Sequence, residues 1–220
     1  MLADLAGRPA GRPAFLTSEG RADRMKKRLK EIADFRMGYQ FRGKVQPDPV
    51  GTVRVIQIKD VDENLRISVD DITSVSIDRP EPYLVRRGDV LFLGRGHRLY
   101  AGIVPAVEPN TIATGYFFIL RPNDRVVSPE YLAWSLNQPD FQESLRPFHR
   151  GTQMPIISKT DLQNLRIHLP PLNVQRRVVE LHRLLDEERR LSAEISEKRS
   201  LLVRAVSRNL MHDPTTEKDD

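Results

Sequence analysis

The spacing of hydrophobic residues changes once along the chain, at Pro170 and Pro171. Before these prolines, short apolar runs alternate with turn-forming segments, a pattern typical of a domain that mixes strands and helices. After them, apolar residues recur at intervals of three and four positions, which is the period of an α-helix with one apolar face. The pattern therefore predicts an α+β fold: a mixed α/β globular domain over residues 25–170, then a long C-terminal coiled-coil helix over residues 171–212.

Apolar runs predict the strands of the globular domain. The clearest is Val53–Ile58, where apolar and polar positions nearly alternate. A second run, Val90–Leu93, follows the tight turn Arg87-Gly88-Asp89, and a third covers Ile112–Leu120. Two shorter strand candidates are Leu65–Val69 and Val75–Ile77.

Capping residues predict where the short helices begin. Ser128 followed by Pro129 is a strong helix start, and it opens the segment that contains Trp134, which we expect in the core. Residues 140–145, after Pro139, form a further helical turn. Ser158 with Asp161 three residues later resembles a capping box, so another helix is expected there.

The segment after Pro171 predicts one helix of about 58 Å, from Asn173 to Met211. Its apolar stripe cannot be buried within a single helix, so a partner helix is required. Glu180 with Arg183, and Glu194 with Lys198, are spaced to form ion pairs on its surface. The stripe consists of Val174, Val178, Leu181, Leu185, Ile195, Leu202 and Val206, with Glu188, Ser192 and Arg199 interrupting it and Leu184 and Leu191 on a neighbouring face.

The two ends of the chain lack such patterns. Residues 1–24 contain Gly-Arg-Pro twice and little apolar periodicity, which indicates a disordered leader or an over-extended start of the reading frame. Residues 213–220 are polar and are expected to form a disordered tail.

Composition narrows the classes of protein. The chain of 220 residues has no cysteine, which excludes disulfides, thiolate metal sites and cysteine nucleophiles. It has no apolar run near the roughly 18 residues that span a bilayer, and no secretory signal near its start, so we expect a cytoplasmic protein without a membrane partner.

Positive charge suggests a polyanionic partner. The net charge is +5, and residues 1–50 carry 11 basic and 6 acidic side chains while residues 51–150 carry 12 and 13. A basic cluster at residues 24–30 can contact phosphate or form a solvated surface. The best candidate for contact with nucleic acid is the loop Gly94–Tyr100, whose glycines allow close approach and whose arginines can bind guanine or phosphate. The alternative is a plain basic hairpin loop.

Enzymatic chemistry has little support in the sequence. The five histidines show no zinc-type spacing, the Gly94-x-Gly96 pair lacks the third glycine of a dinucleotide fingerprint, and the tetrapeptide of the amino-methyltransferases is absent. One alternative is a Mg²⁺-dependent nuclease that uses Asp48, Gln57 and Lys59, because these residues form a loose version of its motif. A strand followed by an aspartate explains the same residues more simply, and we expect no catalytic residues and no metal site.

The stretch Arg150–Arg177 combines a Gly-Thr-Gln turn, a capped helix, an alternating run and two prolines. In this order it resembles the closing motif of the DNA-specificity (S) subunits of type I restriction-modification systems. A weaker resemblance at the start of the domain involves Leu29, Glu31, Ile32, Ala33, Gly38, Ile58 and Asp60. The residues that match the closing motif are Gly151, Thr152, Gln153, Pro155, Ile156, Asp161, Leu162, Ile167, Leu169, Pro170, Pro171, Leu172, Gln175 and Val178.

The resemblance implies a target recognition domain over residues 25–170 and a conserved dimerisation and spacer helix over residues 171–212. A full S subunit has two of each, so this chain resembles a half-subunit that pairs with itself through antiparallel helices. The dimer helix would use Val178, Leu181, Leu185, Ile195 and Leu202. DNA contacts are expected from Arg42, Lys44, Arg95, His97, Arg98, Tyr100, Arg150, Thr152 and Gln153.

The resemblance also implies the partners. These are double-stranded DNA, read as a bipartite site by the homodimer, together with the methyltransferase (M) and restriction (R) subunits. The chain itself would hold no cofactor, because S-adenosylmethionine belongs to the partner methyltransferase. A third class, a coiled-coil scaffold that binds only protein, predicts no salt-sensitive DNA binding.

Overall fold

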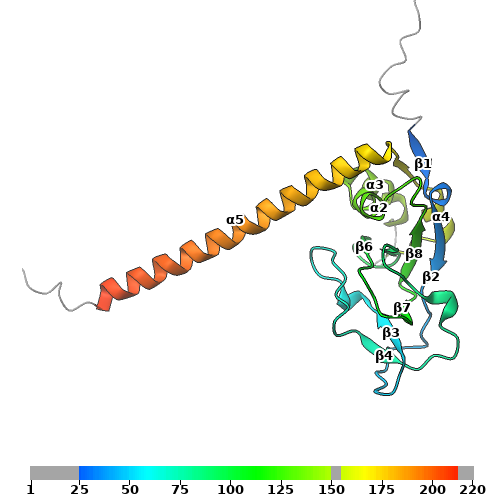
Figure 1. The fold of residues 1–220 in the computed structure, drawn as a ribbon, viewed down its shortest axis with the longest axis horizontal. Helices are drawn as coiled ribbons and strands as arrows, with labels where there is room; N and C mark the ends of the chain where they lie inside the picture. The colour runs from blue at the N-terminus through cyan, green and yellow to red at the C-terminus, as the bar shows by residue number, and fades with distance from the viewer. Residues whose placement is uncertain (1–24, 150–154, 213–220) are drawn as a thin grey trace, which may run out of the picture. The chain divides into compact units, whose positions relative to one another are not determined.

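The structure is a computed structural model that describes residues 25–149 and 155–212. Its contacts divide the chain into two compact units, with the boundary between Pro171 and Leu172 (Figure 1). The expected leader, residues 1–24, and the expected tail, residues 213–220, lie outside the described residues. Within each unit the mixed α/β domain and the long C-terminal helix predicted from the sequence are confirmed.

An antiparallel sheet of four strands forms the centre of the first unit, in the order β2-β8-β5-β6 (Figure 1). Its strands are β2 (Ala33–Met37), β8 (Phe117–Pro122), β5 (Val90–Leu93) and β6 (Ala101–Ile103). In the register of the sheet, Leu91 of β5 lies opposite Ile119 of β8. All four residues of β5 are buried, because other strands flank it on both edges and side chains cover both faces. This explains why its sequence is a continuous apolar run.

A second sheet of three strands has the order β4-β3-β7. Strand β3 (Val53–Ile56) pairs antiparallel with β4 (Thr73–Val75) and parallel with β7 (Thr111–Ala113). The expected single strand over Ile112–Leu120 is therefore wrong, because β7 and β8 belong to different sheets. Gly115 lies in the turn between them, and its backbone N–H donates to the carbonyl oxygen of Tyr39 at 2.7 Å.

Two of the shorter strand predictions also need correction. Residues Leu65–Val69 form only an isolated bridge, between Val61 and Ile67, because the Asp62 carboxylate accepts hydrogen bonds from nearby backbone N–H groups and holds a turn. Strand β4 begins at Thr73, two residues before the expected start, and ends at Val75 where the expected strand begins.

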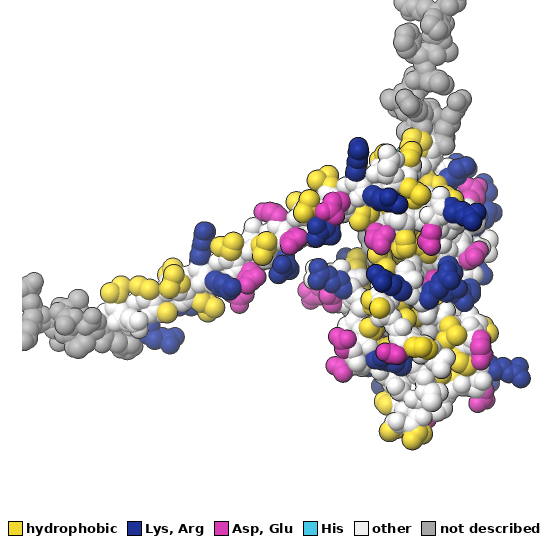
Figure 2. Space-filling view, viewed as in Figure 1, with side chains coloured by type: hydrophobic (Ala, Val, Ile, Leu, Met, Phe, Trp, Pro, Cys, Tyr) yellow, Lys and Arg dark blue, Asp and Glu magenta, His cyan; other side chains and the backbone are white. Residues whose placement is uncertain are grey.

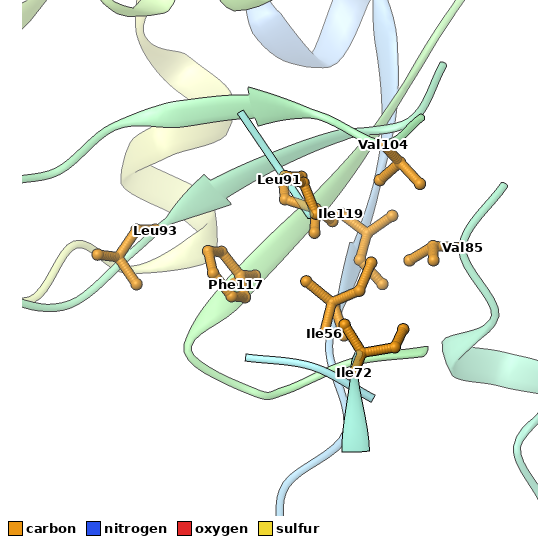
Figure 3. Packing of buried hydrophobic residues seen from close by; sticks show 10 residues of the cluster. Ile56, Ile72, Val85, Leu91, Leu93, Val104, Phe117 and Ile119 are labelled. Carbon is orange, nitrogen blue, oxygen red and sulfur yellow. The ribbon is translucent and has the colours of Figure 1, made fainter. Parts of the chain in front are cut away.

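The main core lies between the two sheets (Figure 3). Its largest side chain is Phe117 of β8, which is 1% exposed and packs with aliphatic side chains from both sheets. Full burial of one such side chain contributes about 1.5–3 kcal/mol to stability. The labelled members of the cluster in Figure 3 are Ile56, Ile72, Val85, Leu91, Leu93, Val104, Phe117 and Ile119.

A buried ion pair joins the start of β5 to the end of β8 in the central sheet. Asp89, immediately before β5, is 1% exposed and accepts two hydrogen bonds from Arg121, at 2.8 and 2.7 Å. The backbone N–H of Arg86 donates a third bond to the same carboxylate. Arg36 of β2 lies 3.9 Å away, and burial together with the Arg121 charge lowers the pKa of its guanidinium. Asp89 thus links the turn before β5 to β8.

Short helices complete the described part of the domain. They are α2 (Pro129–Leu136), α3 (Pro139–Ser144) and α4 (Lys159–Asn164), with 3₁₀ turns at Leu29–Glu31, Ile58–Asp60, Glu81–Tyr83 and Arg146–His149. Ser128 and Ser158 cap α2 and α4, each accepting a backbone N–H at 3.1 Å, so both predicted helix starts are confirmed. Trp134 is partly exposed instead of fully buried, because its side of α2 lines a surface groove.

The basic cluster at residues 24–30 contributes a strand. Strand β1 (Lys26–Arg28) pairs antiparallel with β9 (Arg166–His168) to form a two-stranded ribbon. The backbone N–H of Leu169 donates to the carbonyl oxygen of Met25 at 2.8 Å, so the first and last described parts of the domain lie side by side.

The second unit is helix α5 (Leu172–His212), a single helix of 41 residues and about 61 Å. Its two predicted ion pairs are confirmed, Arg183 with Glu180 at 2.9 Å and Lys198 with Glu194 at 2.8 Å. Figure 2 shows hydrophobic side chains on the visible surface of this helix. No helix in the described part of the chain combines the length and hydrophobicity needed to cross a membrane.

Candidate nucleic-acid interface

The glycine-containing loop Gly94–Tyr100 connects β5 to β6 as a hairpin. The backbone N–H of Leu93 donates to the carbonyl oxygen of Tyr100 at 2.8 Å and closes the loop. Arg95, His97 and Arg98 are exposed, whereas Leu99 is buried and anchors the loop to the domain. The loop therefore holds two guanidinium groups at the surface on a short, fixed backbone.

Two glycines give this loop its shape. A Cβ at Gly94 would lie 2.3 Å from a ring carbon of Phe118, so no larger residue fits there. Gly96 has a φ of 134°, which residues with a side chain rarely adopt. Gly94 therefore lets the loop pack closely against the domain, whereas at Gly96 the backbone can approach a ligand closely.

The loop pairs with a segment far away in the sequence. The N–H of Gly96 donates to the carbonyl oxygen of Pro155, and the N–H of Ile157 donates to that of Gly94, both at 3.0 Å. Arg150, Thr152 and Gln153, which are expected to contact DNA, lie outside the described residues. Pro155, which pairs with the loop, is the first described residue after them.

Tyr116 and Gln40 extend the same surface and were not predicted from the sequence. Gly94 N–H donates to the carbonyl oxygen of Tyr116 at 3.0 Å, and the Gln40 amide donates to that of Gly115 at 3.2 Å. Tyr116 is 50% exposed. The sequence signal for Tyr116 is the glycine before it, which ends one strand and turns the aromatic side chain outwards.

Arg42 and Lys44 follow Gln40 by two and four residues in an exposed loop. Phe41, between Gln40 and Arg42, packs against Tyr39 with ring centroids 4.7 Å apart. This contact fixes the base of the loop and leaves both cations at the surface.

Tyr100 has a different environment from the other expected contacts. Its ring packs against the main core, and burial raises the pKa of its phenol, while the neighbouring Arg98 charge acts in the opposite direction. The ring therefore supports the loop from the inside.

The described side chains can bind nucleic acid in three ways. Guanidinium groups of Arg42, Arg95 and Arg98 can bind phosphate oxygens or the edge of guanine with paired hydrogen bonds. The Gln40 amide can pair with an adenine edge, and the Tyr116 ring can stack. Figure 2 shows basic and acidic side chains interspersed on the visible face of the domain, so a local cluster of cations matters more than the net charge.

The residues of the nuclease alternative do not form one site. The Asp48 carboxylate accepts a hydrogen bond from Ser76 at 2.6 Å, and this bond lowers its pKa. Gln57 and Lys59 donate instead to the Thr73 hydroxyl, at 2.9 and 3.3 Å. Thr73 and Ser76 are three residues apart, about 10 Å along an extended chain, which is too far for one metal ion. In the described ranges no group of three metal-binding side chains is found.

The surface of α5 is the second candidate site. Leu181 is 67% exposed, Leu185 41%, Ile195 50% and Leu202 64%, while Val178 is partly exposed. Leu184 and Leu191 are exposed next to this stripe. The expected dimer residues thus form an apolar surface available to another chain.

Comparison with known proteins identifies relatives of both units. Residues 22–198 match the family model described as "Type I restriction modification DNA specificity domain". No curated protein matches the chain in sequence.

Three solved structures share its fold. The HsdS subunit from Thermoanaerobacter tengcongensis is 24% identical with a TM-score of 0.54, and the match covers 74% of this chain and 37% of that one. The type I S subunit from M. genitalium is 16% identical with a TM-score of 0.52, covering 86% and 46%. A structure on the "complex assembly" and "conformational transition of the type I R-M system" is 22% identical with a TM-score of 0.61, covering 91% and 47%. The match thus spans less than half of each of these proteins.

Proposed function

This chain belongs to the family of type I restriction-modification DNA specificity domains, and from this premise we propose that it reads a DNA sequence as a homodimer without catalysing a reaction itself. Its single recognition domain and single long helix correspond to a half-subunit. In this proposal the recognition domain contacts DNA and α5 joins two copies.

The observation that carries the DNA-binding proposal is the pairing of Gly94–Gly96 with Pro155–Ile157. It joins the loop that presents Arg95 and Arg98 to the segment that follows Arg150, Thr152 and Gln153. Phosphate contacts from the cations would supply salt-dependent affinity, and a few side chains at base edges would select the sequence. The proposed DNA-contact residues are Gln40, Arg42, Lys44, Arg95, His97, Arg98, Tyr116, Arg150, Thr152 and Gln153, with Tyr100 supporting the loop from the inside.

The apolar stripe of α5 supports antiparallel pairing in one particular register. If the two-fold axis passes level with residue 190, Val174 meets Val206, Val178 meets Leu202, and Leu185 meets Ile195. Leu181 then meets Arg199, and Glu188 meets Ser192 near the axis. Shifting the register by one heptad in either direction leaves fewer apolar pairs. Apolar contacts near both ends and polar contacts at the centre would therefore fix the alignment.

Two-fold symmetry has a consequence for the DNA site. Two identical recognition domains at opposite ends of a helix pair would read two identical half-sites in inverted orientation. We propose that the dimer also docks methyltransferase and restriction subunits, and that the methyltransferase supplies S-adenosylmethionine.

Selection of bound duplexes from a random-sequence pool tests the DNA-binding proposal. We expect the pure protein to enrich an inverted repeat. In the double variant Arg95→Ala with Arg98→Ala, affinity for that duplex should fall at least about tenfold, since a lost bidentate contact costs about 1–3 kcal/mol. The salt dependence of binding should also weaken.

Arg125→Ala is the matched control, because Arg125 is exposed in the turn after β8, at the opposite end of that strand from Tyr116. A dimer that shows no salt-dependent DNA binding would indicate the protein-binding scaffold instead. Plasmid cleavage with Mg²⁺ that Asp48→Ala abolishes would indicate the nuclease.

A further inference from the structure

A groove lies between the β1–β9 ribbon and helices α2 and α3, and its lining contains none of the residues proposed to contact DNA. Its volume is about 400 Å³. Tyr131, Trp134 and Phe141 form an aromatic wall, in which the Tyr131 and Trp134 rings have centroids 5.3 Å apart. The Tyr131 hydroxyl donates to the carbonyl oxygen of His168 at 3.0 Å and holds this wall against β9.

The ribbon that borders the groove places two arginines directly opposite each other. In its register Arg28 faces Arg166, and Lys26 faces His168. Because side chains alternate along a strand, all four lie on one face of the ribbon, and the like charges of Arg28 and Arg166 destabilise the strand pair. No carboxylate among the described residues lies within ion-pair distance of Lys26, Arg28 or Arg166. An anion bound over the ribbon would relieve this repulsion.

The aromatic wall indicates what kind of anion fits. Nucleic-acid phosphates would satisfy the cations but gain little from an apolar wall. An acidic peptide that also carries a proline would use both, because a proline ring packs well on aromatic faces. Residues 213–220 of this chain, DPTTEKDD, contain four acidic residues, one lysine and Pro214.

Chain connectivity decides which copy can supply this peptide. His168 precedes Leu172, the first residue of α5, by four residues, so the chain itself limits the distance between their Cα atoms to about 14 Å. Residues 213–220 span at most about 29 Å when extended, whereas α5 is about 61 Å long. A chain therefore cannot readily reach its own groove with this segment. With the two-fold axis at residue 190, however, residue 208 of the second copy is level with Leu172.

We propose that residues 213–220 of one copy bind in the groove of the other copy, with their carboxylates on the cations of the ribbon and Pro214 against the aromatic wall. This inference rests on the antiparallel pairing proposed above. It makes the recognition domain a docking partner for the second chain, so that each domain is joined to its own helix and to the last residues of the partner chain at the same end of the helix pair.

Disulfide trapping tests the inference, because the natural chain has no cysteine. The full-length variant Ser144→Cys with Thr216→Cys places one thiol in the groove and one in the acidic segment. Under mild oxidation we expect it to form a dimer that reductant reverses. Each single-cysteine variant should form far less disulfide-linked dimer. Ser144 is replaced by a residue of nearly the same shape, which limits damage to folding.

A second pair of cysteines tests the helix pairing separately. Leu185→Cys with Ile195→Cys should form disulfides between the copies when the axis lies at residue 190. If this pair is trapped and the Ser144–Thr216 pair is not, the groove inference is overturned while the helix pairing stands. If neither pair is trapped, the pairing itself is overturned, and the groove inference with it.

Removing residues 213–220 provides a measurement without cysteines. We expect the dimer dissociation constant to rise about tenfold, as for two or three partly exposed ion pairs. Arg166→Glu should raise the dimer dissociation constant by a similar factor, and the two changes together should raise it little more than either alone.

If Arg166→Glu instead weakens DNA binding and leaves dimerisation unchanged, the ribbon binds phosphate and the inference is wrong. If deletion of residues 1–20, and not of the acidic segment, weakens the dimer, the leader fills the groove and the inference is equally wrong.

Discussion

The recognition domain buries its large apolar side chains, whereas α5 exposes many of its own. In the domain, Phe92, Ile119 and Leu132 are 0% exposed, and their burial stabilises the chain that contains them. In α5, Leu181 and Leu202 are 67% and 64% exposed. Burial within the chain therefore stabilises the domain, whereas in the proposed dimer the stability of the helix would depend on protein concentration.

Ion pairs show the same contrast. Asp89 and Arg121 form a bidentate pair at the base of the central sheet, with the carboxylate fully enclosed. Arg183 and Glu180 form a pair of similar length on α5, with both side chains more than half exposed. Similar distances do not imply similar energies, because water screens the exposed pair more strongly than the pair whose carboxylate is buried.

The largest expected effect comes from breaking the buried pair. Asp89→Ala should lower the free energy of unfolding of the domain by about 3 kcal/mol, because it leaves Arg121 without its partner next to Arg36. Urea denaturation followed by the fluorescence of Trp134, the single tryptophan, measures this change. Asp124→Ala, at an exposed position, should stay within about 0.5 kcal/mol of the natural protein. If Asp89→Ala also changed the free energy of unfolding by less than about 0.5 kcal/mol, the buried pair would contribute no more to stability than an exposed one.

An effect of intermediate size is expected on α5. Leu185→Asp should raise the dimer dissociation constant about a hundredfold, because two-fold symmetry places two charges in the helix contact. Sedimentation equilibrium measures it, and the urea midpoint of the domain should not move. Glu197→Ala, on the opposite face of the helix, serves as control. Loss of domain stability in Leu185→Asp would show that the two units are not energetically separate.

The smallest effect concerns the exposed pair. The hydrogen bond from Arg183 lowers the pKa of the Glu180 carboxyl, so Arg183→Ala should raise that pKa towards its ordinary value. The pair stabilises the helix fully above the ordinary pKa of glutamate and loses its effect as the pH falls through the lowered value. A carbon-13 NMR titration of the carboxyl measures the change. Arg204→Ala, far along the helix, should leave it unaltered, and added salt should shrink the difference.

Features set by neighbouring residues could be predicted from the sequence. Ser128 and Ser158 cap their helices because the cap bonds a backbone group three residues away. The pairs Glu180–Arg183 and Glu194–Lys198 follow from the helical period alone. The Gly94–Tyr100 loop is recognisable because its glycines and arginines are adjacent in sequence.

Features set by residues that are far apart in the sequence could not be predicted from it. The run Ile112–Leu120 divides between two sheets because Tyr39 and Gly38 bind its middle, and their position depends on the whole fold. The groove exposes part of Trp134 because β1 and β9, more than 100 residues apart, meet beside α2. Gln40 joins the candidate interface through Gly115, which no local pattern indicates.

The hydrogen bond between Leu169 and Met25 has a consequence for how such domains can be rearranged. A domain whose first and last strands are neighbours can be inserted into a host loop that widens by only about 5 Å, the spacing of paired strands. Residues 25–169 could therefore be transplanted as a cassette, or circularly permuted through a short linker, without cutting the core. Exchanging one recognition domain for another would then require only two splice points, side by side in space.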